Sequence, residues 1–262
     1  MSNVLVVVNT KGGVGKSIIA SQVLPVLFRE CSKRIKIYEI DDNNKTFYKN
    51  SNLEFKTLKT EKSEEAIDEV YFDLELDDNI VNIIDAGGSN DTKVVLNAIK
   101  KAELQNLSYF IPVNDDFEQF NNAKNVINII KDIDAYAKIY LIFNRVVDLN
   151  FEKVKQQFIA FFGSEEYGIE GHFDEIANKI ENYLMIQNTQ LLPILKNYYG
   201  TTLYDFYHEN KDLIKNSEKY KKEWVQHGRD FFKKQMKHFR FAKDVFDLID
   251  YIDKYANFLQ DK

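Results

Sequence analysis

The sequence predicts a doubly wound α/β fold, with a mostly parallel sheet covered by helices on both faces and a helical C-terminal extension. Short apolar runs alternate with helix-like segments up to about residue 150, as in parallel sheets with crossover helices. Glycine-rich or polar motifs directly follow several of these runs. Because ligands of such folds bind beyond the carboxyl ends of the strands, we expect the functional site there.

The composition is that of a globular protein. The chain has 262 residues, of which 44% are hydrophobic and 29% charged, which argues against disorder. A net charge of −6 gives no overall reason to expect nucleic-acid binding, although charge can be uneven along a chain. The single cysteine, Cys31, rules out an internal disulfide and fits a reduced setting. No apolar run reaches the length of an export signal or a membrane span, so we expect a cytoplasmic protein.

The expected strands are short apolar runs. The first, residues 4–8, is β-branched apart from Leu5 and leads into a glycine-rich turn, which is typical of a buried parallel strand. The other expected strands are residues 35–40, 80–84, 107–113 and 138–143. Helical periodicity predicts helices between them, at residues 17–30 with a kink site at Pro25, 61–72, 91–105 and 115–133.

Beyond residue 150 the pattern is mostly helical. Leu191 to Leu195 is the one late stretch that favours a short strand. From Thr201 to the end we expect helices with a break near Gly228. We therefore divide the chain into an α/β domain of residues 1–210 and a helical extension of residues 211–262 that packs on the same domain.

A phosphate-binding loop is the strongest motif. It reads Lys11-Gly12-Gly13-Val14-Gly15-Lys16-Ser17, close to the pattern Gly-x-x-x-x-Gly-Lys-Ser, with Thr10 in place of the first glycine. The glycines let backbone N–H groups turn inward, and the following helix adds its positive end, so residues 12–18 would enclose phosphate oxygens of ATP. Lys16 should reach the β- and γ-phosphates, and the Ser17 hydroxyl should bind Mg²⁺. A plain glycine-rich turn is the less favoured alternative, since a strand precedes the motif and a helix follows it. We expect contacts from Gly12, Gly13, Val14, Gly15, Lys16, Ser17 and Ile18.

This stretch resembles the deviant Walker A motif of the ParA/MinD family of P-loop ATPases, whose pattern is Lys-Gly-Gly-x-Gly-Lys-Ser/Thr. Every position from Lys11 to Ser17 fits, and Asn9 matches the asparagine usual two residues before the first lysine. The resemblance implies that Lys11 reaches across a dimer interface to the phosphates of the partner's ATP. A cation supplied in this way neutralises charge only in the closed dimer, which would couple nucleotide state to dimerisation.

Asp85 is the candidate carboxylate for the magnesium site. Four of the five residues before it, residues 80–84, are apolar, so it ends a buried strand beside the phosphate loop. A simple strand-ending aspartate is the alternative. Gly87 and Gly88 would form a loop able to rearrange around a γ-phosphate. The segment Ala86-Gly87-Gly88-Ser89 departs from the proline-containing segment often found in the family, which leaves the switch and its partner contacts open.

Two further motifs carry the resemblance. Glu39-Ile40-Asp41 resembles the family's Asp-x-Asp, which implies that Asp41 orients the attacking water and contributes to the metal site, and that Glu39 supports magnesium-bound water. The alternative for this acidic loop is a solvated turn, because Asp and Asn favour turns. Asn144-Arg145 resembles the Asn-Arg whose amide binds the adenine edge. The stretch around Pro193 loosely resembles the proline-containing strand that flanks the base. Residues 150–185 and the C-terminal helices lie outside the resemblance.

The C-terminal extension is positive within an acidic protein. An aromatic-containing basic face of this kind could contact DNA phosphates without reading sequence, and a solvated helix face is the equal alternative. The last helix has an acidic polar face, which anionic lipid would repel, so we expect no membrane anchor. The basic residues are Lys211, Lys215, Lys219, Lys221, Lys222, Arg229, Lys233, Lys234, Lys237, Arg240 and Lys243, against Asp212, Glu218, Glu223, Asp230 and Asp244.

The resemblance implies a magnesium-dependent ATPase that forms an ATP-sandwich homodimer. The dimer would bind DNA nonspecifically and act in plasmid or chromosome partition or in positioning a complex, with slow hydrolysis stimulated by a partner protein. A conjugation or plasmid-stability ATPase with a protein partner is the first alternative. A metabolic ATP-dependent enzyme on the same scaffold is less favoured, because no further catalytic constellation is evident. A binding-only protein is permitted by Glu39, which replaces the usual first aspartate.

Overall fold

The computed structural model describes residues 3–42, 48, 51–88 and 90–256, and these residues form one seven-stranded, fully parallel sheet. The strand order is β3-β2-β4-β1-β5-β6-β7. The central strand β1 therefore has β4, β2 and β3 on one side and β5, β6 and β7 on the other. The predicted α/β fold class is therefore confirmed. The strands are β1 (Val4–Val7), β2 (Arg34–Ile40), β3 (Glu54–Leu58), β4 (Ile80–Ala86), β5 (Ser108–Val113), β6 (Lys138–Val146) and β7 (Asn182–Gln187).

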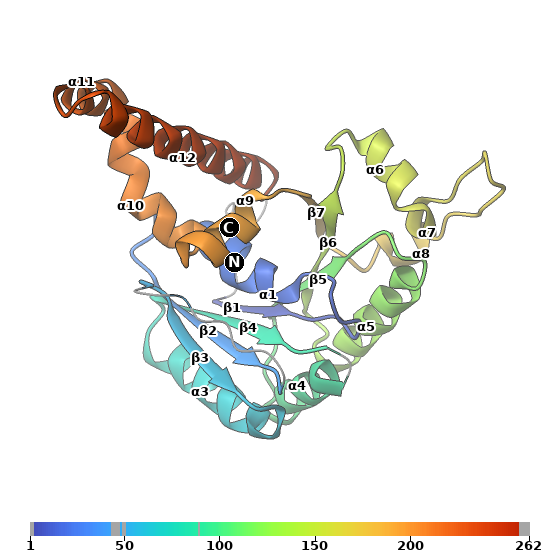
Figure 1. Cartoon of the computed structure of the whole chain (residues 1–262). Helices are drawn as coiled ribbons and strands as arrows, with labels where there is room; N and C mark the ends of the chain where they lie inside the picture. The colour runs from blue at the N-terminus through green and yellow to red at the C-terminus, as the bar shows by residue number, and fades with distance from the viewer. Residues whose placement is uncertain (1–2, 43–47, 49–50, 89, 257–262) are drawn as a thin grey trace.

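Helices cover both faces of the sheet (Figure 1). The alternation along β1 shows the two layers, because Val4 and Val6 join one apolar cluster while Leu5 and Val7 join the other. The first cluster packs α3 (Ser63–Leu76), α4 (Asn90–Lys101) and α5 (Gln119–Ile133) on the sheet. The second packs the helix after the phosphate loop together with α10 (Leu203–Lys215) and α12 (Arg229–Ala256).

The helix after the phosphate loop has an unusual central turn. It comprises α1 (Lys16–Ile18), a π-helical turn η1 (Ile19–Val23) and α2 (Leu24–Val26), and turns follow it. The predicted helix over residues 17–30 thus ends earlier than expected. Pro25 lies in the first turn of α2, where its missing N–H costs least.

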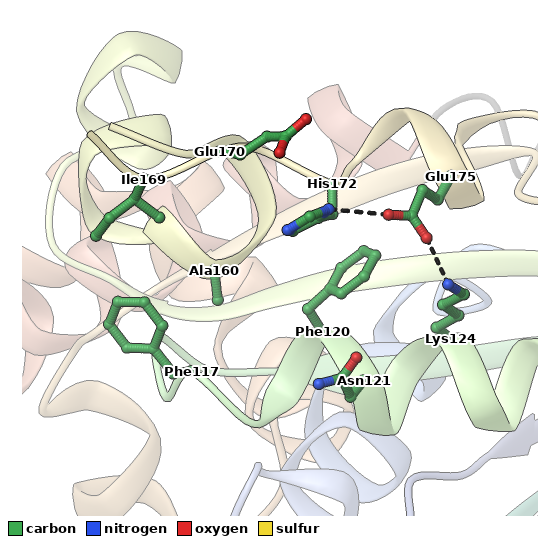
Figure 2. A pocket seen from close by; sticks show the side chains of 9 residues that line it. All are labelled: Phe117, Phe120, Asn121, Lys124, Ala160, Ile169, Glu170, His172 and Glu175. Atoms are coloured by element: carbon green, nitrogen blue, oxygen red, sulfur yellow. Dashed lines mark hydrogen bonds and ion pairs between the residues drawn. The ribbon is translucent and has the colours of Figure 1, made fainter. Parts of the chain in front are cut away.

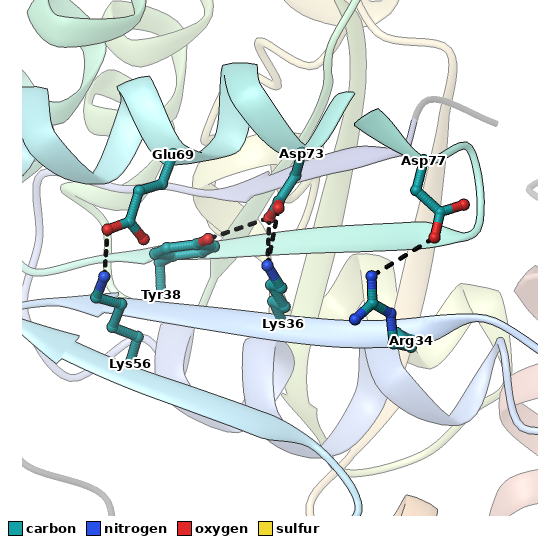
Figure 3. A network of polar contacts seen from close by, with 7 residues as sticks. All are labelled: Arg34, Lys36, Tyr38, Lys56, Glu69, Asp73 and Asp77. Atoms are coloured by element: carbon teal, nitrogen blue, oxygen red, sulfur yellow. Dashed lines mark hydrogen bonds and ion pairs between the residues drawn. The ribbon is translucent and has the colours of Figure 1, made fainter. Parts of the chain in front are cut away.

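A polar network fastens α3 to the edge of the sheet (Figure 3). Asp73 is buried, and its carboxylate accepts hydrogen bonds from Lys36 Nζ at 2.8 and 2.9 Å and from the Tyr38 hydroxyl at 3.3 Å. Burial and the nearby carboxylates raise the pKa of Tyr38. Two more ion pairs, Arg34–Asp77 and Lys56–Glu69, complete the row between the edge strands and α3. These contacts support β3, whose side chains are largely exposed.

In the region after β6, one expected strand is wrong and one strand was not predicted. Leu191 to Leu195 forms no strand: α9 (Leu191–Ile194) and a π-helical turn η3 (Leu195–Tyr199) occupy it, with Pro193 early in the helix where proline is tolerated. The last strand is instead β7, whose apolar run, Tyr183 to Ile186, is only four residues long and lies between polar residues. Between β6 and β7 lie α6 (Phe151–Gln157), α7 (Ile159–Phe162) and α8 (Asp174–Ala177), packed around an aromatic cluster centred on Phe143.

The C-terminal helices form an arm. α10 is followed by α11 (Ser217–Gln226), and α12 begins after Gly228, whose φ of 93° ends the preceding helix as the sequence predicts. The second half of α12 buries Val245, Ile249 and Ile252 against the sheet side of the molecule. α11 and the start of α12 extend away from the sheet (Figure 1). Among the residues that the structure describes, no helix combines the length and the apolar character that crossing a membrane requires.

Candidate functional site

A pocket of about 310 Å³ lies where the carboxyl ends of the central strands meet the phosphate loop. The structure brings most of the expected site residues together here. Four expected residues do not line it: Val14, Asp85 and Asn144 are buried beside the pocket, and Lys11 lies outside it. The lining residues are Gly12, Gly13, Gly15, Lys16, Ser17, Ile18, Asp41, Ala86, Gly87, Gly88, Arg145 and Lys196.

The loop needs its glycines for shape and for space. Gly13 and Gly15 have φ of 76° and 100°, in the region that favours glycine. A Cβ atom on Gly15 would collide with the Asn144 side chain. Asn144 Nδ2 donates to the Val14 carbonyl at 2.8 Å, and its Oδ1 accepts from the Arg145 backbone N–H at 3.0 Å. Asn144 therefore supports the loop from below, and its expected contact with adenine stays a prediction.

Strand register places the acidic groups of the site. Asp85 is the register partner of Glu39 in β2 and of Val7 at the end of β1. Burial and the charges of Glu39 and Asp41 raise the pKa of Asp85 to about 7, against the opposing effects of Ser17 and Lys16. The Oδ1 atom of Asp85 is buried and has no hydrogen-bond partner among the residues that the structure describes. This carboxylate is thus held in a place that costs free energy unless a cation joins it.

The donor set fits a hydrated magnesium ion. Asp85 supplies an unpartnered carboxylate oxygen, and the Ser17 hydroxyl lies beside it. Within the described residues no three acidic, histidine or cysteine side chains cluster to hold an ion by themselves. An ion at this position would therefore need phosphate and water oxygens, as Mg²⁺ in nucleotide sites does.

The two lysines of the loop have different surroundings. Lys16 is buried, its Nζ donates to the Lys11 carbonyl at 2.9 Å, and burial lowers its pKa against the attraction of Asp85 and other acids. Lys11 is partly exposed and its Nζ donates to Glu118 Oε2 at 2.6 Å. That contact raises the pKa of Lys11. Asp116 lies 3.8 Å from the same ammonium group.

The segment after Asp85 is held by residues that the sequence motifs did not single out. Thr92 Oγ1 donates to the Gly87 carbonyl at 2.7 Å, and the Asp91 N–H donates to the Gly88 carbonyl at 3.1 Å. A Cβ atom on Gly87 would collide with the Asp91 side chain. Ser89 lies outside the described residues. Asp91 and Thr92 belong to the start of a helix, and their position beside the loop depends on tertiary folding that no local pattern reveals.

A second cavity, of about 280 Å³, lies between α5 and the segment that joins β6 to β7 (Figure 2). Phe120 lies beside an ion pair of Lys124 with Glu175, whose other oxygen lies 2.9 Å from His172 Nδ1. Phe117 lines the opposite end and is 60% exposed. In the sequence, Phe117 stands between Asp116 and Glu118, the two acids that contact Lys11. No motif found in the sequence pointed to this cavity.

The fold and the pocket define the class of protein. A parallel sheet whose central strand runs into a phosphate loop and a helix is the P-loop nucleotide-binding architecture. No family model matches the sequence, and no curated protein matches it either.

Comparison with solved structures of other proteins identifies the fold more closely. Apo McdA of Cyanothece matches with a TM-score of 0.50 and 15% identity, over 80% of this chain and 94% of that protein. The cell-division protein MinD of Aquifex aeolicus matches with a TM-score of 0.48 and 16% identity, over 77% of this chain and 88% of that one. The chain has the ParA/MinD-like fold that its phosphate loop indicates.

Proposed function

We propose that this chain is a magnesium-dependent ATPase of the ParA type that closes into an ATP-sandwich homodimer. The different surroundings of its two loop lysines carry the proposal. Lys16 is buried over the pocket, whereas Lys11 reaches outward to Glu118 and Asp116 on its own chain. Lys16 would serve the chain's own nucleotide, and Lys11 would exchange these carboxylates for the phosphates bound by a second copy.

The remaining site residues take the roles that their positions permit. The backbone N–H groups of residues 12–18 would enclose the phosphates, and Ser17 and Asp85 would hold the ion. Magnesium, when bound, neutralises charge on the β- and γ-phosphates. Asp41 lines the pocket on the side of the Lys16 ammonium, where it can orient a water molecule and support the metal site. Asn144 and Arg145 would border the adenine.

The arm is the proposed DNA-binding surface. Residues 211–244 carry an excess of Lys and Arg, although the whole chain has a net charge of −6. Lys233, Lys234 and Lys237 belong to the part of α12 that extends from the sheet, and among the described residues none of them forms an ion pair. Such cations bind phosphates without reading base sequence. We therefore propose a cytoplasmic role in partition or positioning, with a partner protein that stimulates hydrolysis. In this proposal residues 1–210 form the ATPase domain and residues 211–262 form its extension.

The second cavity favours one alternative, an ATPase of conjugation or plasmid stability whose partner is a protein. Phe117 presents an exposed aromatic ring at that cavity, next to the acids that contact Lys11. A protein segment seated there would contact the same loop that holds the lysine. Binding of duplex DNA by the ATP-bound dimer favours the first function, and its absence favours this one.

Light scattering of the purified chain with ADP and with ATP tests the proposal, each with and without duplex DNA. We expect ATP to drive dimerisation, the Asp41→Ala variant to retain the dimer longer, and the Lys11→Ala variant to stay monomeric. The Lys62→Ala variant is the matched control, because this exposed lysine also pairs with a carboxylate but lies outside the pocket. A wild-type chain that binds ATP and stays monomeric would contradict the proposal.

A further inference from the structure

We propose that Lys196, on the pocket wall formed by the region after β7, binds the α-phosphate of the nucleotide. The inference rests on the nucleotide binding proposed above and adds a residue from the region after β7. Lys196 lines the pocket together with Ile18 and Arg145 and is half-buried. Among the residues that the structure describes, no hydrogen bond or ion pair engages its ammonium group.

The backbone around Lys196 departs from a regular α-helix. The residue belongs to the π-helical turn η3, which follows Pro193 and ends at Gly200 with φ of 65°. The Thr201 N–H then donates to the Leu195 carbonyl at 3.1 Å. A π-helical turn is wider than an α-helical one and changes the direction of its side chains, and such turns are frequent at functional sites.

Gln22 fastens this wall to the helix that begins at the phosphate loop. Its Oε1 accepts from the Leu203 N–H at 2.7 Å, and its Nε2 lies 3.5 Å from the Thr201 carbonyl. Gln22 is almost fully buried, so these contacts are shielded from water. Ile18 precedes Gln22 by four residues and therefore lies on the same side of the helix. The wall that carries Lys196 thus runs beside Ile18.

The position beside Ile18 selects the α-phosphate. In a phosphate loop the lysine reaches the β- and γ-phosphates, while the first backbone N–H groups of the helix face the α- and β-phosphates. Asp41 and Asp85 act on the Lys16 ammonium, so the acidic groups gather at the γ end, where Mg²⁺ offsets charge. The α-phosphate would lie away from that end, and Lys196 and Arg145 are the cations other than Lys16 among the residues that line the pocket. A single ammonium group without a carboxylate partner suits one phosphate group.

Competition binding against a fluorescent ADP analogue tests the inference, with AMP, Mg²⁺–ADP and Mg²⁺–ATP as competitors. We expect the Lys196→Ala variant to bind all three about tenfold more weakly or worse, by a common factor, because a charge-assisted hydrogen bond to a shared phosphate is lost. The Lys196→Arg variant should retain most of the affinity. The Asn197→Ala variant, exposed on the same turn, controls for disturbance of the backbone and should bind as wild type does. Urea unfolding of each variant confirms that the fold is kept.

Each outcome decides a separate point. A loss confined to ATP would place Lys196 at the γ-phosphate and overturn the assignment, and unchanged binding of all three nucleotides would remove its role altogether. The Lys16→Ala variant separates these failures from failure of the proposed function. If wild type binds and Lys16→Ala does not, while Lys196→Ala binds normally, only the inference fails. If wild type binds no nucleotide, both fail.

Discussion

Replacing Asp85 by Asn should stabilise the nucleotide-free protein and abolish its magnesium-dependent binding. Asp85 is buried at the register position beside Glu39, and one of its oxygens has no hydrogen-bond partner. Its pKa is raised to about 7, mainly by burial, which means that its surroundings in the protein disfavour the charged carboxylate. An uncharged amide of the same shape removes that penalty, and it also removes the ligand that the ion needs.

The magnitude follows from the pKa. An aspartate with an ordinary pKa of 3.8 in the unfolded chain and about 7 in the folded one binds its proton more tightly when folded. Its contribution to stability is present at low pH and is lost, by about 1.4 kcal/mol per pH unit, as pH rises between these two values. The Asp85→Asn variant has no such loss. Its advantage over wild type should therefore grow by about 2 to 3 kcal/mol between pH 5 and pH 8.

Urea unfolding followed by circular dichroism, in a chelator and without nucleotide, measures this difference at several pH values. Asp134→Asn is the matched control, because Asp134 is also fully buried but accepts hydrogen bonds from the backbone N–H groups of Asn106 and Leu107. That variant should be destabilised at every pH, since an amide nitrogen cannot accept. Parallel pH profiles for wild type and Asp85→Asn would refute the reasoning. In a second arm, Mg²⁺ with nucleotide should stabilise wild type only.

Three further predictions concern the loop, the interface and the arm. The Gly15→Ala variant should lose nucleotide affinity and about 1 to 3 kcal/mol of stability in urea unfolding, because its Cβ meets Asn144 at a φ of 100°. The Glu118→Gln variant should dimerise at a lower ATP concentration in light scattering, because it weakens the contact that holds Lys11 within one chain. DNA binding should weaken steeply with salt, and the Lys234→Ala variant should reduce the slope of log affinity against log salt by about 1.

The central strands and the loop could be predicted because their signals are local. β1, β4 and β5 are buried on both faces and are mostly apolar, and the glycines follow from the backbone shape that a phosphate loop requires. The order of motifs after strand ends also predicted that Lys16, Asp41 and Arg145 would meet at one edge of the sheet, and they line one pocket.

The edge strands and the far wall of the pocket could not be predicted in this way. β3 has mostly exposed side chains and therefore lacks the apolar pattern of a central strand. β7 has an apolar run, Tyr183 to Ile186, but a run of four residues does not by itself distinguish a strand from a buried helical segment. The segment from Leu191 to Leu195 is as apolar as a strand, and only its packing shows that it is helical. Lys196 was also missed because its position depends on tertiary packing. Its place in the pocket follows from contacts of Gln22 with Thr201 and Leu203, residues far along the chain.

Two buried charged groups of the pocket region would both be stabilised by the proposed ligands. Lys16 and Asp85 are both buried, and burial shifts the pKa of each toward its uncharged form. Phosphates favour the charged lysine and a metal ion favours the charged carboxylate, so the loaded site restores both charges. Lys11 adjoins this loop, because Asn9 Oδ1 accepts from the Lys11 N–H while Asn9 Nδ2 donates to the Pro112 carbonyl at 2.8 Å. Under the proposed function, phosphates would compete for the Lys16 ammonium group, which donates to the Lys11 carbonyl at 2.9 Å, and this contact would be the physical route from nucleotide binding to the release of Lys11 from Glu118.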